Sequence, residues 1–173
     1  MVARIFQNLF WTKQRVLREF TQESFALIEN AVNDAEKGHA AEVKVVIEGG
    51  MPLYKVLLGV TSFDRAKEVF TSEKIGITAG RTGILVYILM AERRIEILSD
   101  HAVVVSSGTL NTWTELFTSI IKSKVNIHKG IQSPVLDAII AVLGQIGDYS
   151  RNTFSDYNSP YLTNELCDKP KII

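Results

Sequence analysis

Three acidic residues lie where extended stretches of the sequence begin or end, and carboxylates in such places can bind metal ions. Glu92 and Asp100 follow two consecutive apolar stretches, and Glu42 opens an earlier one. Ca²⁺ and Mg²⁺ bind several oxygen atoms, which strand ends can bring together from distant parts of a chain. We therefore expect a Ca²⁺ or Mg²⁺ site with Glu92, Asp100 and Glu42 as candidate ligands. The alternative is that each is a solvated surface carboxylate.

A loop before the most apolar stretch contains groups that bind anions. Thr78, Arg81 and Thr82 offer hydroxyls and a guanidinium, and the neighbouring glycines expose backbone amides. This composition predicts a site for a phosphate or carboxylate group, with Arg93 from a later charged turn as a further candidate. The loop is not a Walker motif, because G-x-x-x-x-G-K-[ST] is absent. The alternatives are a tight turn that needs its glycines and, for Arg93, a solvated charge cluster.

The sequence contains no recognisable activated nucleophile. No G-x-S-x-G element is present, and the only cysteine, Cys167, lies in a polar segment without an activating group nearby. A single cysteine also excludes a disulfide within the chain. Covalent catalysis is therefore not predicted.

Three predicted strands position the candidate ligands. Residues 42–48 place Val43, Val45 and Ile47 on one side of an extended strand. Residues 83–90 (GILVYILM) are continuously apolar and should form a central strand covered on both faces. Residues 95–98 are extended again and should pair with the central strand as a hairpin. If that hairpin is antiparallel, Glu92 lies at its turn and Asp100 near its opposite end, so the two need not share a site.

Helices are predicted on both faces of this sheet. Apolar residues recur at helical spacing in residues 12–37, 110–121 and 136–146, and Ser62 is a candidate cap for a shorter helix. The fold class we predict is α/β: a single three-layer α/β/α sandwich with a mixed central sheet. Residues 1–147 would form this domain with an N-terminal helix. The polar residues 148–173 would form a C-terminal tail that is poorly ordered or lies on the surface.

Charge and hydropathy restrict the partners and the compartment. The chain has 19 Lys and Arg and 19 Asp and Glu, so nucleic-acid binding is not expected. The first residues lack a secretory signal, and the longest apolar run is shorter than the roughly 20 residues of a membrane-spanning helix. We expect a cytoplasmic protein with a protein partner and no transmembrane segment, for which peripheral membrane association stays open.

Residues 66–105 resemble the TPM domain family, which is named for a thylakoid-lumen phosphatase-like protein, a photosystem repair protein and a nematode receptor modulator. The similarity covers roughly residues 20–147. The elements that carry it most specifically are residues 77–78, 81–83, the apolar strand, residues 92–93 and Asp100. The resemblance implies an α/β/α sandwich, binding of calcium or magnesium in some members and release of phosphate from model esters in others.

This sequence departs from the family pattern at three positions. Glu92 stands where aspartate is usual, Thr82 replaces a common asparagine, and His101 occupies a position often taken by arginine. Three hypotheses follow. The chain is a cation-binding module that interacts with a protein partner, a metal-dependent acid phosphatase that cleaves phosphomonoesters, or a purely structural α/β domain.

Overall fold

Four strands form one mixed sheet in the computed structural model, which describes residues 2–123, 133–154 and 165–173. The strands are β1 (Glu42–Glu48), β2 (Gly83–Leu89), β3 (Arg94–Ser99) and β4 (Lys171–Ile172). Their order is β3-β2-β1-β4: β1 is parallel to β2 and β4, and β3 is antiparallel to β2. The central position of residues 83–89, the hairpin and the mixed sheet are confirmed.

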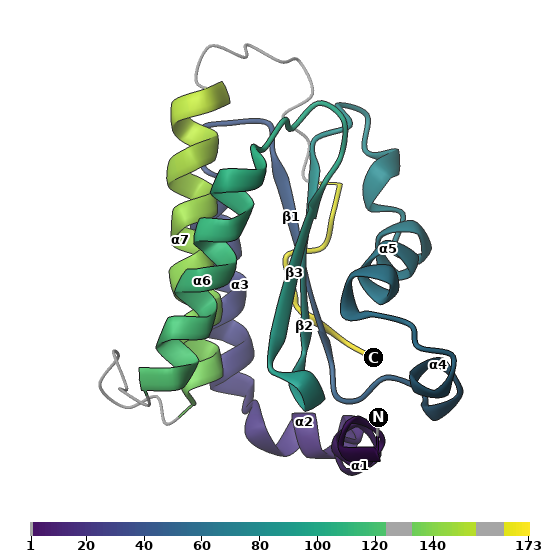
Figure 1. The fold of residues 1–173 in the computed structure, drawn as a ribbon. Coiled ribbons are helices and arrows are strands. Elements are labelled where there is room, and N and C mark those ends of the chain that lie inside the picture. The colour runs from purple at the N-terminus through teal and green to yellow at the C-terminus, as the bar shows by residue number, and fades with distance from the viewer. Residues whose placement is uncertain (1, 124–132, 155–164) are drawn as a thin grey trace.

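Long helices cover one face of the sheet (Figure 1). They are α3 (Gln22–Glu36), α6 (Ser107–Ser123) and α7 (Pro134–Phe154). Strand residues on this face, among them Val45, Val86 and Ile97, share one hydrophobic core with Phe117 of α6 and Ile139 of α7. All seven residues of β2 are buried, which is why its sequence shows no polar alternation.

Shorter helices cover the other face. These are α4 (Leu53–Leu57), α5 (Ser62–Ser72) and the 3₁₀ turn η1 (Ile75–Ile77). They pack on the alternate residues of the same strands, including Val46, Leu85 and Tyr87. Helices on both faces of one sheet make a three-layer α/β/α sandwich, and the predicted fold class is confirmed (Figure 1).

Two local predictions about helix starts were wrong. Residues 12–37 form two helices, α2 (Lys13–Glu19) and α3, because Phe20 is extended and Thr21 caps a new helix by accepting a hydrogen bond from Ser24 N–H. Helix α5 is capped by Thr61, one residue before Ser62. Its hydroxyl accepts from Asp64 N–H and the Asp64 carboxylate accepts from Thr61 N–H, which is a capping box.

The C-terminal part also differs from the prediction. Helix α7 continues through Phe154, so the boundary expected at residue 147 lies inside a helix. Tyr149 explains part of this extension, because its ring packs edge-on against Trp113 with the ring centroids 5.5 Å apart. Residues 155–164 of the predicted tail lie outside the described residues. Its last residues form β4, which extends the sheet beside β1.

The N-terminal helix and a 3₁₀ turn lie at the end of the sheet where the β2–β3 hairpin turns. Helix α1 (Val2–Phe10), which was not predicted, contacts α4 and the 3₁₀ turn η2 (Met90–Glu92) (Figure 1). Among the described residues, no helix combines the length and the apolar character that crossing a membrane requires.

Candidate functional site

The antiparallel hairpin separates two of the three predicted metal ligands. Glu92 belongs to the turn after β2, whereas Asp100 follows β3 and returns to the start of β2, where its N–H donates to Gly83 O at 2.9 Å. Seven strand residues span roughly 20 Å, so these carboxylates lie at opposite ends of the sheet. Glu42 pairs with Gly83 in the parallel register and therefore lies at the Asp100 end.

Glu92 holds α1 against the hairpin. Its carboxylate accepts from Arg4 Nε at 2.7 Å and from Asn8 Nδ2 at 3.2 Å. Asn8 also accepts from the N–H of Met51 at 2.7 Å, and Arg4 Nη2 donates to Val60 O at 2.6 Å. The sequence-predicted ligand Glu92 therefore has a structural role at this end.

Glu42 fastens the C-terminal segment to β1. Its Oε2 accepts from the backbone N–H groups of Glu165 at 2.9 Å and Leu166 at 2.7 Å. Burial raises the pKa of Glu42, and these two hydrogen bonds act in the opposite direction. Lys44 adds to the same attachment by donating to Cys167 O at 2.6 Å and Lys169 O at 3.1 Å.

Asp100 is the predicted ligand that has a buried side-chain oxygen without a hydrogen-bond partner among the described residues. Its side chain is 5% exposed, and Oδ1 accepts from His101 N–H at 2.8 Å and lies 2.9 Å from His101 Nδ1. Oδ2 is buried and has no hydrogen-bond partner among the described residues. A Cβ built on Gly76 would lie 3.7 Å from Oδ2, so this oxygen faces the η1 turn.

The three predicted ligands, Glu42, Glu92 and Asp100, nevertheless do not share one site. Across residues 2–123, 133–154 and 165–173, no group of three or more His, Cys, Asp or Glu side chains is arranged to hold a metal ion. A cation at Asp100 would depend on one carboxylate, with backbone carbonyls and water as further ligands. Mg²⁺ in particular often keeps several waters and takes only one or two protein carboxylates.

The predicted anion-binding loop is a tight turn at the Asp100 end. Arg81 N–H donates to Thr78 O at 2.9 Å, and Thr82 N–H donates to the Thr78 hydroxyl at 3.2 Å. Both threonines are buried, while Arg81 is exposed and has a left-handed backbone with φ of 51°. The loop already holds one anion, because Ala79 N–H donates to the Glu165 carboxylate at 3.1 and 3.2 Å.

Arg93 does not join this loop. It ends the η2 turn in a left-handed conformation with φ of 50° and is exposed at the hairpin-turn end of the sheet. The structure thus brings Thr78, Arg81 and Thr82 together and leaves Arg93 at the opposite end.

Comparison with known proteins identifies the family. The model of the TPM domain matches residues 16–141 of the chain. The chain belongs to the TPM family. The resemblance noted in the sequence is confirmed by this match.

One solved structure with this fold is the NMR structure of the BA42 protein from the psychrophilic bacterium Bizionia argentinensis. Its TM-score is 0.69 at 21% sequence identity, and the alignment covers 89% of this chain and 95% of that chain. At this identity the likeness shows the fold alone. No curated protein matches the chain.

One titratable residue of this TPM domain was missed by sequence reasoning. Glu36, in the last turn of α3, accepts from Val43 N–H at 2.6 Å. The pKa of Glu36 is raised to about 7, mainly by burial and in part by the nearby carboxylates of Asp168 and Glu42, while the hydrogen bond from Val43 N–H acts in the opposite direction. No local signal distinguished Glu36, because Asp168 and Glu42 approach it only in the fold.

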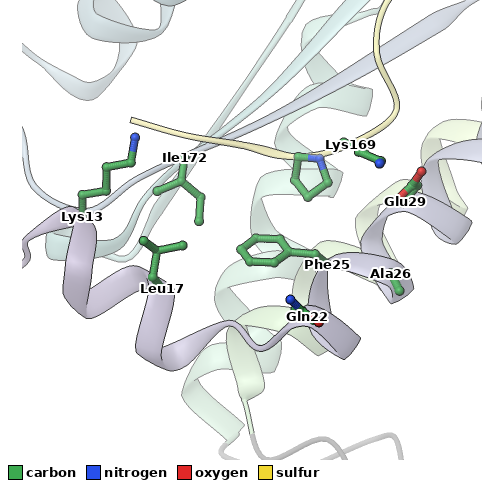
Figure 2. Close-up of a pocket in the computed structure, with 9 residues that line it drawn as sticks. Lys13, Leu17, Gln22, Phe25, Ala26, Glu29, Lys169 and Ile172 are labelled. Carbon is green, nitrogen blue, oxygen red and sulfur yellow. The ribbon is translucent and has the colours of Figure 1, made fainter.

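A groove of about 470 Å³ lies between α2, α3 and the C-terminal segment of the TPM domain (Figure 2). Leu17, Phe25 and Ile172 give it apolar walls, and Lys13 and Lys169 lie at its margins (Figure 2). The groove was also missed, because its walls are separated by more than a hundred residues of sequence.

Proposed function

We propose that this TPM domain is a binding module that takes up Ca²⁺ or Mg²⁺ through Asp100 and interacts with a protein partner. The observation that supports cation binding is the buried Oδ2 of Asp100, which has no hydrogen-bond partner within residues 2–123, 133–154 and 165–173. It is an oxygen of the residue type that hard divalent cations prefer, next to the η1 turn.

Asp100 differs from Glu48, another buried carboxylate of the domain, in how its oxygens are hydrogen-bonded. Glu48 is at least as buried, with 4% of its side chain exposed, and both of its carboxylate oxygens accept hydrogen bonds. It accepts from the Tyr87 hydroxyl at 2.6 Å and from Arg65 Nε and Nη2 at 2.9 and 3.0 Å. A buried polar atom without a partner costs about 1–3 kcal/mol, and more if it is charged. A cation at Oδ2 would remove that cost at Asp100.

Thermal unfolding of metal-free protein during titration with Ca²⁺ or Mg²⁺ tests the proposal. An ion present at a hundred times its Kd stabilises the fold by about 2.7 kcal/mol, which corresponds to a rise in Tm of about 5–10 °C for a chain of this length. We expect a saturable rise for the wild type and none for Asp100→Asn. The matched control is Glu92→Gln, which changes the carboxylate at the opposite end and should keep the ion response.

Measuring phosphate release and Tm in the same samples distinguishes the three hypotheses. Release of phosphate from an aryl phosphate, dependent on metal and lost in Asp100→Asn, would favour the phosphatase. Stabilisation by metal without turnover supports the binding module. A Tm that neither Ca²⁺ nor Mg²⁺ changes would favour the purely structural domain.

The phosphatase alternative has no specific observation in its favour. Its charge-balancing arginines, Arg81 and Arg93, lie at opposite ends of the sheet, and Glu92 is paired with Arg4. Metal-assisted phosphoryl transfer usually gathers acids and cations around one phosphate. The cytoplasmic location and the absence of nucleic-acid binding stay predictions.

For the protein partner, the groove in Figure 2 is the surface that we propose for docking. Its apolar walls suit an apolar side chain of a partner, and Lys13 and Lys169 suit a neighbouring carboxylate. A photo-crosslinking amino acid at Leu17 should give a discrete adduct of higher mass in cells. The control is the same amino acid at Thr112, an exposed position on α6. Equal labelling at both positions, or none at Leu17, would argue against this surface.

A further inference from the structure

Helix α1 is attached to the domain through Arg4 and Asn8, and Ile5 packs against the hydrophobic core beneath α4 and α5. Arg4 and Asn8 both donate to the Glu92 carboxylate, and Asn8 accepts from the buried N–H of Met51. Asn8 is buried, whereas Phe6 and Phe10 are 54% and 62% exposed. Most apolar residues of α1 therefore face outward, whereas a usual surface helix buries its apolar side.

The outward side of α1 is a continuous apolar surface. Val2, Phe6, Leu9 and Phe10 recur at three and four residues and are all exposed, so they lie on one side of the helix. The rings of Phe6 and Phe10 stack with their centroids 6.5 Å apart. We call these four residues the α1 apolar face.

Helix α4 contributes more apolar side chains beside α1. The two helices are in contact and lie together at the hairpin-turn end of the sheet (Figure 1). Leu57 and Leu58 are 60% and 77% exposed, and Tyr54 is also exposed. Residues 49–60 contain one charged residue, Lys55, which pairs with Glu68 of α5.

Positive charge lies beside the Phe10 end of the α1 apolar face although the whole chain is neutral. Residues 1–18 contain four basic residues and no Asp or Glu. Phe10 shares the lining of a pocket of about 430 Å³ with Arg15 and Arg18, and Arg15 lines a neighbouring pocket with Arg93. The carboxylate of Glu19 lines both pockets, so the local balance of Arg15, Arg18, Arg93 and Glu19 is positive.

We propose that the α1 apolar face inserts into the headgroup region of an anionic lipid bilayer, with Arg15, Arg18 and Arg93 at the phosphates. An exposed apolar helix side flanked by basic residues is the usual composition of helices that lie in a membrane interface. Basic residues near an anionic surface add attraction that falls with salt. An apolar protein partner would explain Phe6 and Phe10 but not the segregated positive charge.

This inference goes beyond cation binding and is independent of it. Asp100 lies at the other end of the sheet, so Asp100→Asn should leave lipid binding unchanged. Failure of one proposal can therefore be recognised without the other.

Co-sedimentation with lipid vesicles tests the proposal. We expect the full chain to bind vesicles of phosphatidylcholine with about 30% phosphatidylglycerol at least about tenfold more tightly than pure phosphatidylcholine vesicles, with weaker binding in about 0.5 M NaCl. The double variant Phe6→Ser/Phe10→Ser should lose about tenfold or more in affinity for the anionic vesicles. Its Tm should be unchanged, because neither ring is buried.

The matched control replaces equally exposed apolar residues elsewhere. Ile77 and Val104 are 72% and 76% exposed near the Asp100 end, and Ile77→Ser/Val104→Ser should bind anionic vesicles like the wild type. Equal loss in both double variants, or no binding by the wild type, would overturn the proposal. A wild-type dimer in solution that Phe6→Ser/Phe10→Ser dissociates, without vesicle binding, would assign the surface to a second copy of the chain and also overturn it.

Discussion

Replacing Glu36 with glutamine should change how the stability of the domain depends on pH. The carboxyl keeps its proton in the folded protein up to a pKa of about 7, whereas the unfolded chain loses it near 4.5. Between these values the folded state binds more protons than the unfolded state, so Glu36 lowers the free energy of unfolding as pH rises. Below about 4.5 the residue carries no such penalty, and above 7 the penalty is constant.

The size of the effect follows from the difference between the folded and unfolded pKa values of Glu36. A tenfold change in a proton-binding constant corresponds to about 1.4 kcal/mol of free energy. The rise in pKa from 4.5 to about 7 therefore predicts a loss of about 3 kcal/mol as pH increases through this window. Glutamine keeps an oxygen that can accept from Val43 N–H but never ionises, so Glu36→Gln should lack this loss.

Urea unfolding at pH 5, 6, 7 and 8 measures the difference between the wild type and Glu36→Gln. The difference is the useful quantity because burial lowers the pKa of His39, which makes stability rise with pH near its usual value of 6.5 and acts against Glu36. Glu23→Gln, an exposed position on the same helix, is the control and should track the wild type. The reasoning is refuted if Glu36→Gln and the wild type lose the same stability between pH 5 and 8.

Three other predictions test the packing. Leu85→Ala should lower the free energy of unfolding in urea by about 2–5 kcal/mol, because Leu85 is fully buried; a loss under about 1 kcal/mol would contradict its central place. Gly83→Ala would put a Cβ 2.3 Å from the backbone oxygen of Ile75 and should abolish folding. Gly144→Ala meets nothing within 4 Å and should raise the free energy of unfolding by about 0.5–1 kcal/mol. Similar Tm values for the two variants would disprove the close approach at Gly83. Asn8→Ala should cost about 1–3 kcal/mol and speed amide exchange at Met51, whose N–H it leaves unpaired; unchanged protection there would disprove the contact.

The sheet was the most predictable part of the molecule. The apolar run at residues 83–89 required cover on both faces, and the structure has helices on both. The short polar turn after it predicted the hairpin, and an antiparallel hairpin meant that Glu92 and Asp100 need not share a site; the structure places them at opposite ends of the sheet. The apolar or polar type of successive strand residues indicates these features, because alternate side chains point to opposite faces of the sheet and each face is either covered by helices or open to solvent.

The helix boundaries were less predictable. The apolar spacing from residue 12 to residue 37 fits one helix, but Thr21 caps a second one and the chain turns at Phe20. Helix α7 passes the change to polar composition at residue 148 because its side chains still find partners, such as Tyr149 with Val104 O at 2.9 Å. Helix caps and tertiary contacts depend on the path of the chain beyond the helix, and local amino-acid composition does not predict that path.

The sequence by itself determined the family, the fold class and the set of carboxylates and arginines available for chemistry. Only the tertiary structure decided which of them remain available. Glu92 is occupied by Arg4, 88 residues away, and Glu42 by Leu166, 124 residues away. Asp100 alone among the predicted ligands keeps a buried oxygen without a partner in the described part of the chain. Residue type sets which bonds a side chain can make, whereas folding decides which neighbours have already made them.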